Sequence, residues 1–413
     1  MTPQTVVMVT TSYPRFPGDL TGTFLESIAH GVADRGHIVH VVAPWHPLVT
    51  RPIREGNVHF HFYRYAPVEA LTVFGYASAL KADTSIRPAA YLAAPFALFA
   101  GHQLIRRVIR TSGATVIHAH WVIPSGAIAT FAAGGLPLVV SLHGSDIYVA
   151  ERYSLARTAA RYAFSRAQWV TACSEDLRQR AVALGADGVH SEVVPYGVDV
   201  ARFTPDREAS AKVRTVNGIA DDERIVLAVG RLVRKKGFEY LIDAVATLAT
   251  SHPALRLVIA GSGDLGTELR RRAIDAGIAE RVTWLGAISQ NAVADWLTAA
   301  DIVAVPSLRD ATGNVDGLPN VVLEALASAT PLVATTAGGI GPVIADRETA
   351  LAVPERDARG LARAIETLLG DDVLAARIGN AAREHMRAQY SWSLVAERFE
   401  TAYDQAARRV NRP

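Results

Sequence analysis

Short hydrophobic runs alternate along the chain with segments in which apolar residues recur every three or four positions. The runs are rich in Val, Ile and Leu, as is typical of parallel strands buried on both faces. They fall at Thr5–Thr11, His37–Pro44, Thr115–Trp121, Leu136–Gly144, Gln168–Ser174, Arg224–Arg231, Leu255–Gly261, Arg281–Gly286, Asp301–Ser307, Thr330–Gly339 and Leu351–Pro354. Helical patterns such as Glu239–His252 follow them. This alternation predicts an α/β fold with two doubly wound, parallel-sheet domains in series.

The alternation is interrupted once, between Val193 and Asp206, where Pro195, Gly197 and Pro205 occur. Because Pro and Gly mark breaks between elements, we expect a hinge there. The predicted domains are residues 1–195 and 196–388. Residues 389–413 form a predicted terminal helix that either caps the second domain or packs back on the first. A length of 413 residues fits two or three domains.

Composition narrows the class of protein. The formal charge is +2, from 42 Lys plus Arg against 40 Asp plus Glu, so we expect no nucleic-acid partner. Cys173 is the only cysteine in the sequence, which precludes an intrachain disulfide and any Cys-based metal cluster. The N-terminus lacks a basic segment followed by a long apolar run. These features predict a cytoplasmic protein in a reducing compartment.

Two long runs without Asp, Glu, Lys or Arg raise the question of a membrane. Thr115–Ser145 is broken by His, Gly and Pro residues, so it predicts strand, turn, helix, turn and strand within a covered sheet. Pro88–Ile105 precedes Arg106, Arg107 and Arg110, an apolar face with a basic rim. That arrangement leaves two interpretations open, a core helix with a solvated end or a peripheral contact with the cytoplasmic membrane face.

Residues that follow strands are the candidates for chemistry, because ligands of open α/β sheets bind beyond the carboxyl ends of the strands. Gly22 lies in such a loop before a helix and lets a ligand approach the backbone closely. The loop matches neither the dinucleotide nor the P-loop motif. His143 and Asp146 follow another strand. His118 and His120 alternate along a third, but a metal site would need further convergence, and we expect no metal.

In the second half, four cations occupy six positions of Gly230–Phe238, and two of them, Arg231 and Lys236, suit phosphate oxygens. The stretch Asp316–Ala327 supplies two carboxylates, Asp316 and Glu324, with no obvious partner among those cations. Backbone amides at Gly317 and Leu318, where we expect a helix to begin with Pro319 in its first turn, favour an anion. A nucleotide sugar, a diphosphate between two polyols, satisfies both the cations and the carboxylates.

These stretches, together and in order, resemble the retaining glycosyltransferases of family 4. The similarity covers nearly the whole chain, from SYPRFPGDLTGTF through HAHWVIPSG, LHGSD, PYGVD, GRLVRKKG, AGSGD and DGLPNVVLEALA to SWSLVAERFETAY. It implies the GT-B fold, in which two Rossmann-like domains face each other across a cleft. It also implies an acceptor-binding first domain and a second domain that binds the nucleotide-sugar donor, with UDP or GDP as the expected nucleotide.

The resemblance also implies roles for individual residues. Arg231 and Lys236 match the pair that binds the diphosphate and assists its departure, and His143 matches the residue that lines the donor sugar. Gly22 matches the phosphate-facing loop. Glu324 is the second acid of the family's Glu-x7-Glu pattern, which holds the ribose. Asp316 occupies the first acid position, where Glu is more usual, and this substitution leaves the identity of the sugar open.

The reaction implied is sugar transfer with retained anomeric configuration and no divalent metal. A saccharide or lipid-linked saccharide is the expected acceptor, in the synthesis of a cell-surface polysaccharide or glycolipid. Gly-Gly-Ile-Gly-Pro replaces the family's usual Gly-Gly-Ile-Pro-Glu at 338–342, so a contact made there by Glu is lost. Three alternatives remain at this point: a sugar phosphorylase of the same fold, a nucleotide-sugar epimerase and a non-enzymatic sugar-nucleotide binding module.

Overall fold

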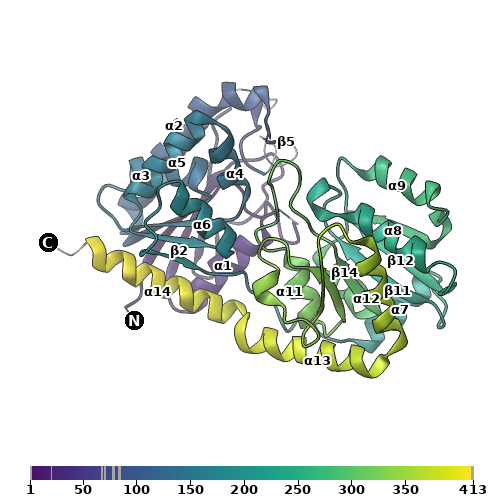
Figure 1. Ribbon diagram of the computed structural model, residues 1–413. Helices are drawn as coiled ribbons and strands as arrows, with labels where there is room; N and C mark the ends of the chain where they lie inside the picture. The colour runs from purple at the N-terminus through teal and green to yellow at the C-terminus, as the bar shows by residue number, and fades with distance from the viewer. Residues whose placement is uncertain are drawn as a thin grey trace. The chain divides into compact units, whose positions relative to one another are not determined.

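The computed structural model describes residues 2–410 except 20, 67, 69, 70, 77–79 and 82–84. The chain divides into two compact units (Figure 1). The first comprises Met1–Tyr196 together with Trp392–Pro413, and the second comprises Gly197–Ser391. The change of unit after Tyr196 lies one residue from the expected domain boundary, and the change after Ser391 lies three residues beyond the expected start of the terminal helix.

The first unit is built on an eight-stranded sheet with the order β10-β9-β8-β7-β1-β2-β4-β3. All neighbouring pairs in it are parallel except β3 and β4, which are antiparallel. The strands are β1 (Thr5–Val9), β2 (Ile38–Pro44), β3 (Arg54–Glu55), β4 (Val58–Tyr63), β7 (Val116–His120), β8 (Leu138–Leu142), β9 (Trp169–Ala172) and β10 (Ser191–Val193). A separate hairpin pairs β5 (Leu80–Lys81) with β6 (Ser85–Ile86).

Helices cover both faces of this sheet. They are α1 (Thr23–Asp34), α2 (Pro88–Ser112), the helical turn η2 (Val122–Gly126), α3 (Ala127–Ala132), α4 (Ser145–Arg152), α5 (Ser154–Arg166), α6 (Glu175–Ala183) and α14 (Trp392–Val410). Val6 and Met8 of β1 share one core with α1 and α14. Because alternate strand residues point to opposite faces, Val7 and Val9 face the other side, where α2 packs on β1 and β2.

The second unit is built on a six-stranded, fully parallel sheet with the order β13-β12-β11-β14-β15-β16. Its strands are β11 (Arg224–Val229), β12 (Leu255–Ala260), β13 (Val282–Gly286), β14 (Ile302–Val305), β15 (Leu332–Thr335) and β16 (Leu351–Val353). Its helices and helical turns are α7 (Arg207–Val216), η3 (Arg234–Lys236), α8 (Phe238–Leu248), α9 (Gly266–Asp275), η4 (Ala279–Arg281), α10 (Gln290–Ala299), α11 (Asn320–Ala327), η5 (Gly341–Val343), α12 (Ala358–Gly370) and α13 (Asp372–Gln389).

The prediction of two doubly wound α/β domains is confirmed, and every hydrophobic run named from the sequence contains a strand. The strand β4 was not predicted. Its sequence, VHFHFY, alternates His and Phe and lacks the continuous apolar character of its neighbours. The uncharged run Thr115–Ser145 forms β7, η2, α3 and β8, as predicted. Among the helices that the structure describes, none combines the length and hydropathy that a membrane crossing requires.

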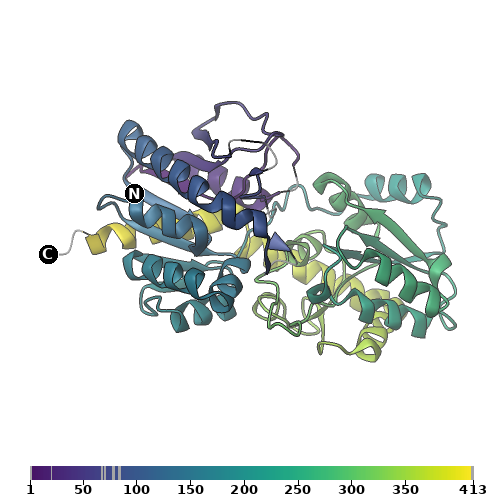
Figure 2. The same cartoon turned by 90° about the horizontal axis from the view of Figure 1, so that it is seen from above.

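The terminal helix α14 belongs to the first unit (Figure 1 and Figure 2). It packs along α1, and the hydroxyl of Tyr403 lies 2.8 Å from Nδ1 of His118 in β7. Glu400 pairs with Arg35, and its other oxygen lies 3.3 Å from Nε2 of the buried His37. These buried polar contacts fix the register of α14 on the sheet, because a shift of the helix would leave each of them without a partner.

Candidate active site

Three loops of the second unit meet beyond the carboxyl ends of the adjacent strands β11, β14 and β15. Lys235 and Lys236 come from the turn η3 after β11, and Asp316 comes from the loop after β14. Gly338 follows β15 with a φ of 60°, and a Cβ there would lie 2.0 Å from the carbonyl oxygen of Asp316. Only glycine permits this close approach, so Gly338 fixes the backbone that carries Asp316.

The Asp316 carboxylate is shared by two lysines. Nζ of Lys235 lies 3.1 Å from Oδ1, and Nζ of Lys236 lies 2.6 Å from Oδ2. The three side chains are only 10–13 % exposed. Burial alone would raise the pKa of Asp316, but the two ammonium groups hold this pKa well below its ordinary value. Asp316 is therefore an anion over the whole physiological pH range.

The expectation that the cations and carboxylates lack mutual pairing is wrong, because Lys235 and Lys236 both pair with Asp316. Besides the two lysines, Arg234 makes paired 2.9 Å contacts with Glu268 of α9. These partners lie tens of residues away in sequence, and the fold brings them together. Arg231 follows β11 in the same loop as the two lysines, and it is exposed.

Glu324 lies in α11 and is partly buried. Burial raises the pKa of this carboxyl group to about 7, although a hydrogen bond from Gln290 and the nearby charge of Arg202 act in the opposite direction. A carboxyl group with such a pKa is poised to lose its proton when a ligand offers hydroxyl donors, because those hydrogen bonds favour the charged form.

The helix that carries Glu324 begins later than predicted. We expected its start near Leu318 with Pro319 in the first turn, but α11 begins at Asn320 and Pro319 is the residue before it. The extended backbone of Pro319, with ψ at 123°, ends the loop rather than starting the helix. Gly317 and Leu318 are both buried, in the short segment between Asp316 and α11.

His143 of the first unit lies just after β8, and both of its ring nitrogens have protein partners. Nδ1 lies 2.9 Å from the Tyr196 hydroxyl, and Nε2 lies 3.0 Å from Nδ1 of His120. The rings of Phe24 and Trp121 lie 4.8 Å and 5.0 Å away. Burial lowers the pKa of His143 to about 3, so the imidazole is neutral at pH 7 and supplies no positive charge.

Two further residues predicted from the sequence lie at the starts of helices of the same unit. Gly22 precedes α1 with a φ of 71°, a conformation that glycine adopts without strain. Asp146 is buried at the start of α4, where its carboxylate accepts hydrogen bonds from the amides of Val122 at 2.8 Å and Gly144 at 3.1 Å. Asp146 thus fixes the loop that positions His143.

Sequence reasoning missed the residues that support the predicted ones. Lys235 was passed over in favour of its neighbour Lys236, and Gln290, His120 and Tyr196 were not given site roles. The adjacency of two lysines was a usable signal, because successive residues in a tight turn can reach the same anion. The partners of His143 and Glu324 left no local signal, since they come from elements distant in sequence.

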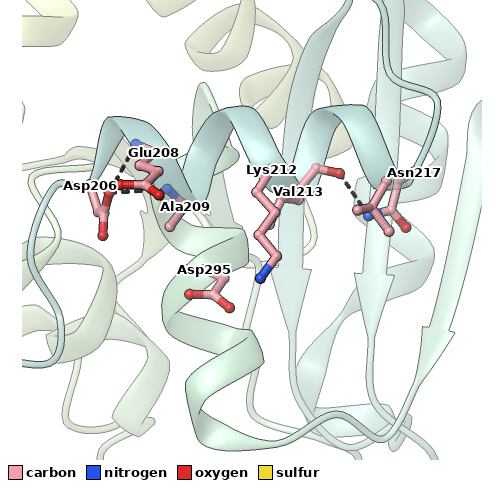
Figure 3. Close-up of a pocket in the computed structure, with 8 residues that line it drawn as sticks. Asp206, Glu208, Ala209, Lys212, Val213, Asn217 and Asp295 are labelled. Carbon is pink, nitrogen blue, oxygen red and sulfur yellow. Dashed lines mark hydrogen bonds between the residues drawn. The ribbon is translucent and has the colours of Figure 1, made fainter.

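A possible metal cluster and a surface groove lie apart from these residues. Among the described residues, Glu26, His30 and Glu55 bring three potential metal-ligand atoms together, but Arg51 pairs with both carboxylates. A groove beside α7 and α10 is lined by Asp206, Glu208, Ala209, Lys212, Val213, Val216, Asn217 and Asp295 (Figure 3). None of the residues predicted for the site lines this groove.

Comparison with known proteins identifies the class. The second half matches the family described as glycosyl transferases group 1 over residues 210–385, and the first half matches the glycosyl transferase 4-like domain over residues 21–197. The solved structure of HepE from Anabaena, in complex with UDP, has a TM-score of 0.75 at 20 % identity and covers 97 % of this chain and 99 % of that one. The fold is GT-B, two Rossmann-like domains in one chain.

Curated relatives narrow the class to a family. A GDP-mannose-dependent monoacylated α-(1-6)-phosphatidylinositol monomannoside mannosyltransferase of Corynebacterium glutamicum is 33 % identical over 273 residues, which are 65 % of this chain and 70 % of the relative. A GDP-mannose-dependent α-(1-6)-phosphatidylinositol monomannoside mannosyltransferase of Mycolicibacterium smegmatis is 33 % identical over 63 % of this chain and 68 % of the relative. The chain belongs to the group 1 glycosyltransferases and is a glycosyltransferase of the GT-B type.

Proposed function

We propose that the protein transfers a sugar from a nucleotide sugar to a saccharide or lipid-linked saccharide, with retention of the anomeric configuration and without a divalent metal. The proposal rests above all on the group formed by Lys235, Lys236 and Asp316 with Glu324 on the following helix. Cations that suit a diphosphate and carboxylates that suit two polyols follow the adjacent strands β11 and β14, at one edge of the sheet. The second unit is then the donor-binding domain and the first unit the acceptor-binding domain.

In the proposed reaction Arg231 and Lys236 bind the diphosphate and stabilise the negative charge that grows on it as the bond to the anomeric carbon breaks. The acceptor hydroxyl oxygen forms the new bond on the face that the diphosphate leaves, and its proton passes to the departing phosphate oxygen. Glu324 accepts hydrogen bonds from the ribose, and Asp316 accepts them from the sugar. His143, a neutral ring whose two nitrogens already have protein partners, lines the sugar and contributes shape rather than charge.

The donor is tested first by thermal stabilisation. A panel of UDP, GDP, ADP and their common sugar conjugates is added to the purified protein, because a ligand specific for the folded state raises the melting temperature by mass action. The GDP-mannose-dependent relatives and the UDP complex of HepE put GDP and UDP first. We expect one nucleotide to stabilise the wild type, and its sugar conjugate to be consumed only with an acceptor, equally well in the presence of EDTA.

Other results of these assays would support one of the three alternative functions. Cleavage of a glycoside by inorganic phosphate identifies a sugar phosphorylase, and conversion of the nucleotide sugar without an acceptor identifies an epimerase. Nucleotide binding with no turnover of any sugar conjugate indicates a binding module. Loss of activity on chelation, with recovery on adding Mg²⁺ or Mn²⁺, contradicts the metal-independent reaction.

We also propose that the first unit contacts the cytoplasmic face of an anionic membrane through α2. The exposed residues of this helix form two zones. Tyr91, Leu92, Phe96 and Phe99 in its first half are 55–69 % exposed, while Ala93 and Ala97 on the opposite side are buried in the unit. The second half exposes Arg106, Arg107 and Arg110. This combination of aromatic and basic residues favours binding to an anionic lipid surface. Each Arg near that surface contributes about 1 kcal/mol to the free energy of binding.

The prediction is that the wild type floats with vesicles containing phosphatidylglycerol, and that the double substitution Phe96→Ser, Phe99→Ser lowers the bound fraction at least about tenfold. Val216 and Val373 of the second unit are similarly exposed, at 74 % and 81 %, so Val216→Ser, Val373→Ser is the matched control and should float like the wild type. Equal flotation of both double variants, or none by the wild type, contradicts the membrane contact.

A further inference from the structure

The two lysines that share Asp316 occupy different positions in the turn η3. Lys235 is buried, with 8 % of the residue exposed, and its carbonyl accepts a 2.8 Å hydrogen bond from the amide of Leu308 beyond β14. Its ammonium group lies on Oδ1 of Asp316. Lys236 lies on Oδ2, and its side chain runs beside Gly230 at the end of β11. Lys235 is thus tied into the sheet, while Lys236 stands where β11 leads into the cationic loop.

The proposed function requires Lys236 to hold the diphosphate. The Asp316 carboxylate then loses the closer of its two ammonium partners, at 2.6 Å, while it stays in a site where the side chain is 13 % exposed. A carboxylate in such a place tends to take up a proton unless another cation stays beside it. A protonated carboxyl group would accept fewer hydrogen bonds from sugar hydroxyls than the carboxylate does.

We propose that Lys235 is a positioning residue that keeps the Asp316 carboxylate charged and oriented towards the donor sugar when Lys236 transfers to the diphosphate. This inference rests on the proposed function and deepens it, since it gives the two adjacent lysines different tasks. Lys236 acts on the leaving group, and Lys235 acts on the reaction through Asp316. Against burial, which raises the pKa of the Asp316 carboxyl group, the ammonium groups of Lys236 and Lys235, both from η3, lower it.

The test is calorimetric and needs no turnover. The nucleoside diphosphate that stabilises the wild type is titrated into the full-length protein at pH 6 in buffers of different ionisation enthalpy, which gives the number of protons taken up on binding. Lys235→Met replaces the side chain with an unbranched apolar one that is one atom shorter, and so removes its charge. We expect Lys235→Met to take up additional protons, approaching one for each nucleotide bound, because binding then leaves Asp316 without a cation.

Two further variants make the result specific. Lys235→Arg retains a cation and should give the wild-type proton number. Lys235→Met combined with Asp316→Asn should show no additional uptake, because the titrating group is gone, and protons exchanged at Glu324 cancel in each comparison. In turnover assays Lys235→Met should move the acid limb of the kcat profile to higher pH, while Lys235→Arg should not.

Each outcome is decisive. The inference is overturned if Lys235→Met binds the nucleotide with the wild-type proton number, or if the additional uptake persists in the Asp316→Asn background. A wild type that binds no nucleoside diphosphate contradicts the proposed function itself, and the inference falls with it. A melting curve of each variant without ligand separates loss of folding from loss of binding.

Discussion

Lys236→Ala is expected to lower kcat by about 10²- to 10³-fold, the usual effect of removing one group that stabilises charge in the transition state. The affinity for the nucleoside diphosphate should change far less. The negative charge on the leaving diphosphate is larger in the transition state than in the bound donor, so an interaction with Lys236 strengthens as the reaction proceeds. Single-turnover and steady-state rates, combined with calorimetric affinities, separate the two effects.

The matched control is Arg234→Ala, in the same turn. Arg234 is 48 % exposed at its side chain and pairs with the exposed Glu268 and, at 3.4 Å, with Glu239, but not with Asp316, so its removal should leave kcat within about twofold of the wild type. An unchanged kcat in Lys236→Ala, or an equal loss in Arg234→Ala, contradicts the role given to Lys236. The second result would indicate that the total positive charge of the loop stabilises the diphosphate, and not a specific contact with Lys236.

Glu324→Gln is expected to have opposite effects on binding and on stability. A neutral amide accepts weaker hydrogen bonds from the ribose than a carboxylate does, so the affinity for the nucleotide should fall about 10- to 100-fold. The ligand-free protein should become more stable at pH 8, because burial disfavours the charged form of Glu324. Weaker nucleotide binding together with higher stability would show that the Glu324 carboxylate serves binding and does not stabilise the fold.

The pH dependence follows from the direction of the pKa shift. The pKa of Glu324 is raised from 4.5 to about 7. The folded state therefore binds more protons than the unfolded state between these values, and its stability falls as pH rises through them. The loss at pH 8 amounts to at most about 3 kcal/mol. Glu324→Gln should thus raise the melting temperature by several degrees at pH 8 and hardly at all at pH 4.

Binding should show the complementary dependence. Because the nucleotide favours the ionised carboxylate, its binding to the wild type releases a proton below pH 7, and the affinity should fall by up to about tenfold for each pH unit below that value. Glu324→Gln should bind weakly with no such dependence. Glu366→Gln, at an exposed position in α12, is the control for both measurements. If Glu324→Gln lowers the melting temperature at pH 8, this contradicts a carboxylate whose charged form is disfavoured by burial.

The sequence predicted the elements of the fold where local patterns are strong. Runs such as those around Val226 and Val258 are continuously apolar, and parallel strands with two buried faces require that pattern. In β4, by contrast, His59 and His61 alternate with apolar residues, and the strand forms because β2 supplies a partner. The formation of β4 therefore depends on its pairing with β2, and a short stretch of sequence does not show which strand it will pair with.

The site divides in the same way. The spacing of Asp316 and Glu324 and the cluster of cations were visible as motifs, since each lies within one short stretch of the sequence. The contact of Asp316 with two lysines joins residues about 80 positions apart, and the contact of His143 with Tyr196 joins residues 53 positions apart. Local composition does not specify which charges meet. The prediction therefore named the groups but left their ion pairs to the structure.

The membership of α14 in the first unit has a consequence for how the protein is made. Along the chain, β10 is the last strand of that unit's sheet. Phe399 and Tyr403 of α14, which complete the core of the unit, come about 200 residues later. During synthesis the ribosome must produce the entire second unit before this helix emerges. Until then the face beside α1 keeps an uncovered apolar surface. The second unit can therefore finish folding before the first, although most of the first unit is synthesised earlier.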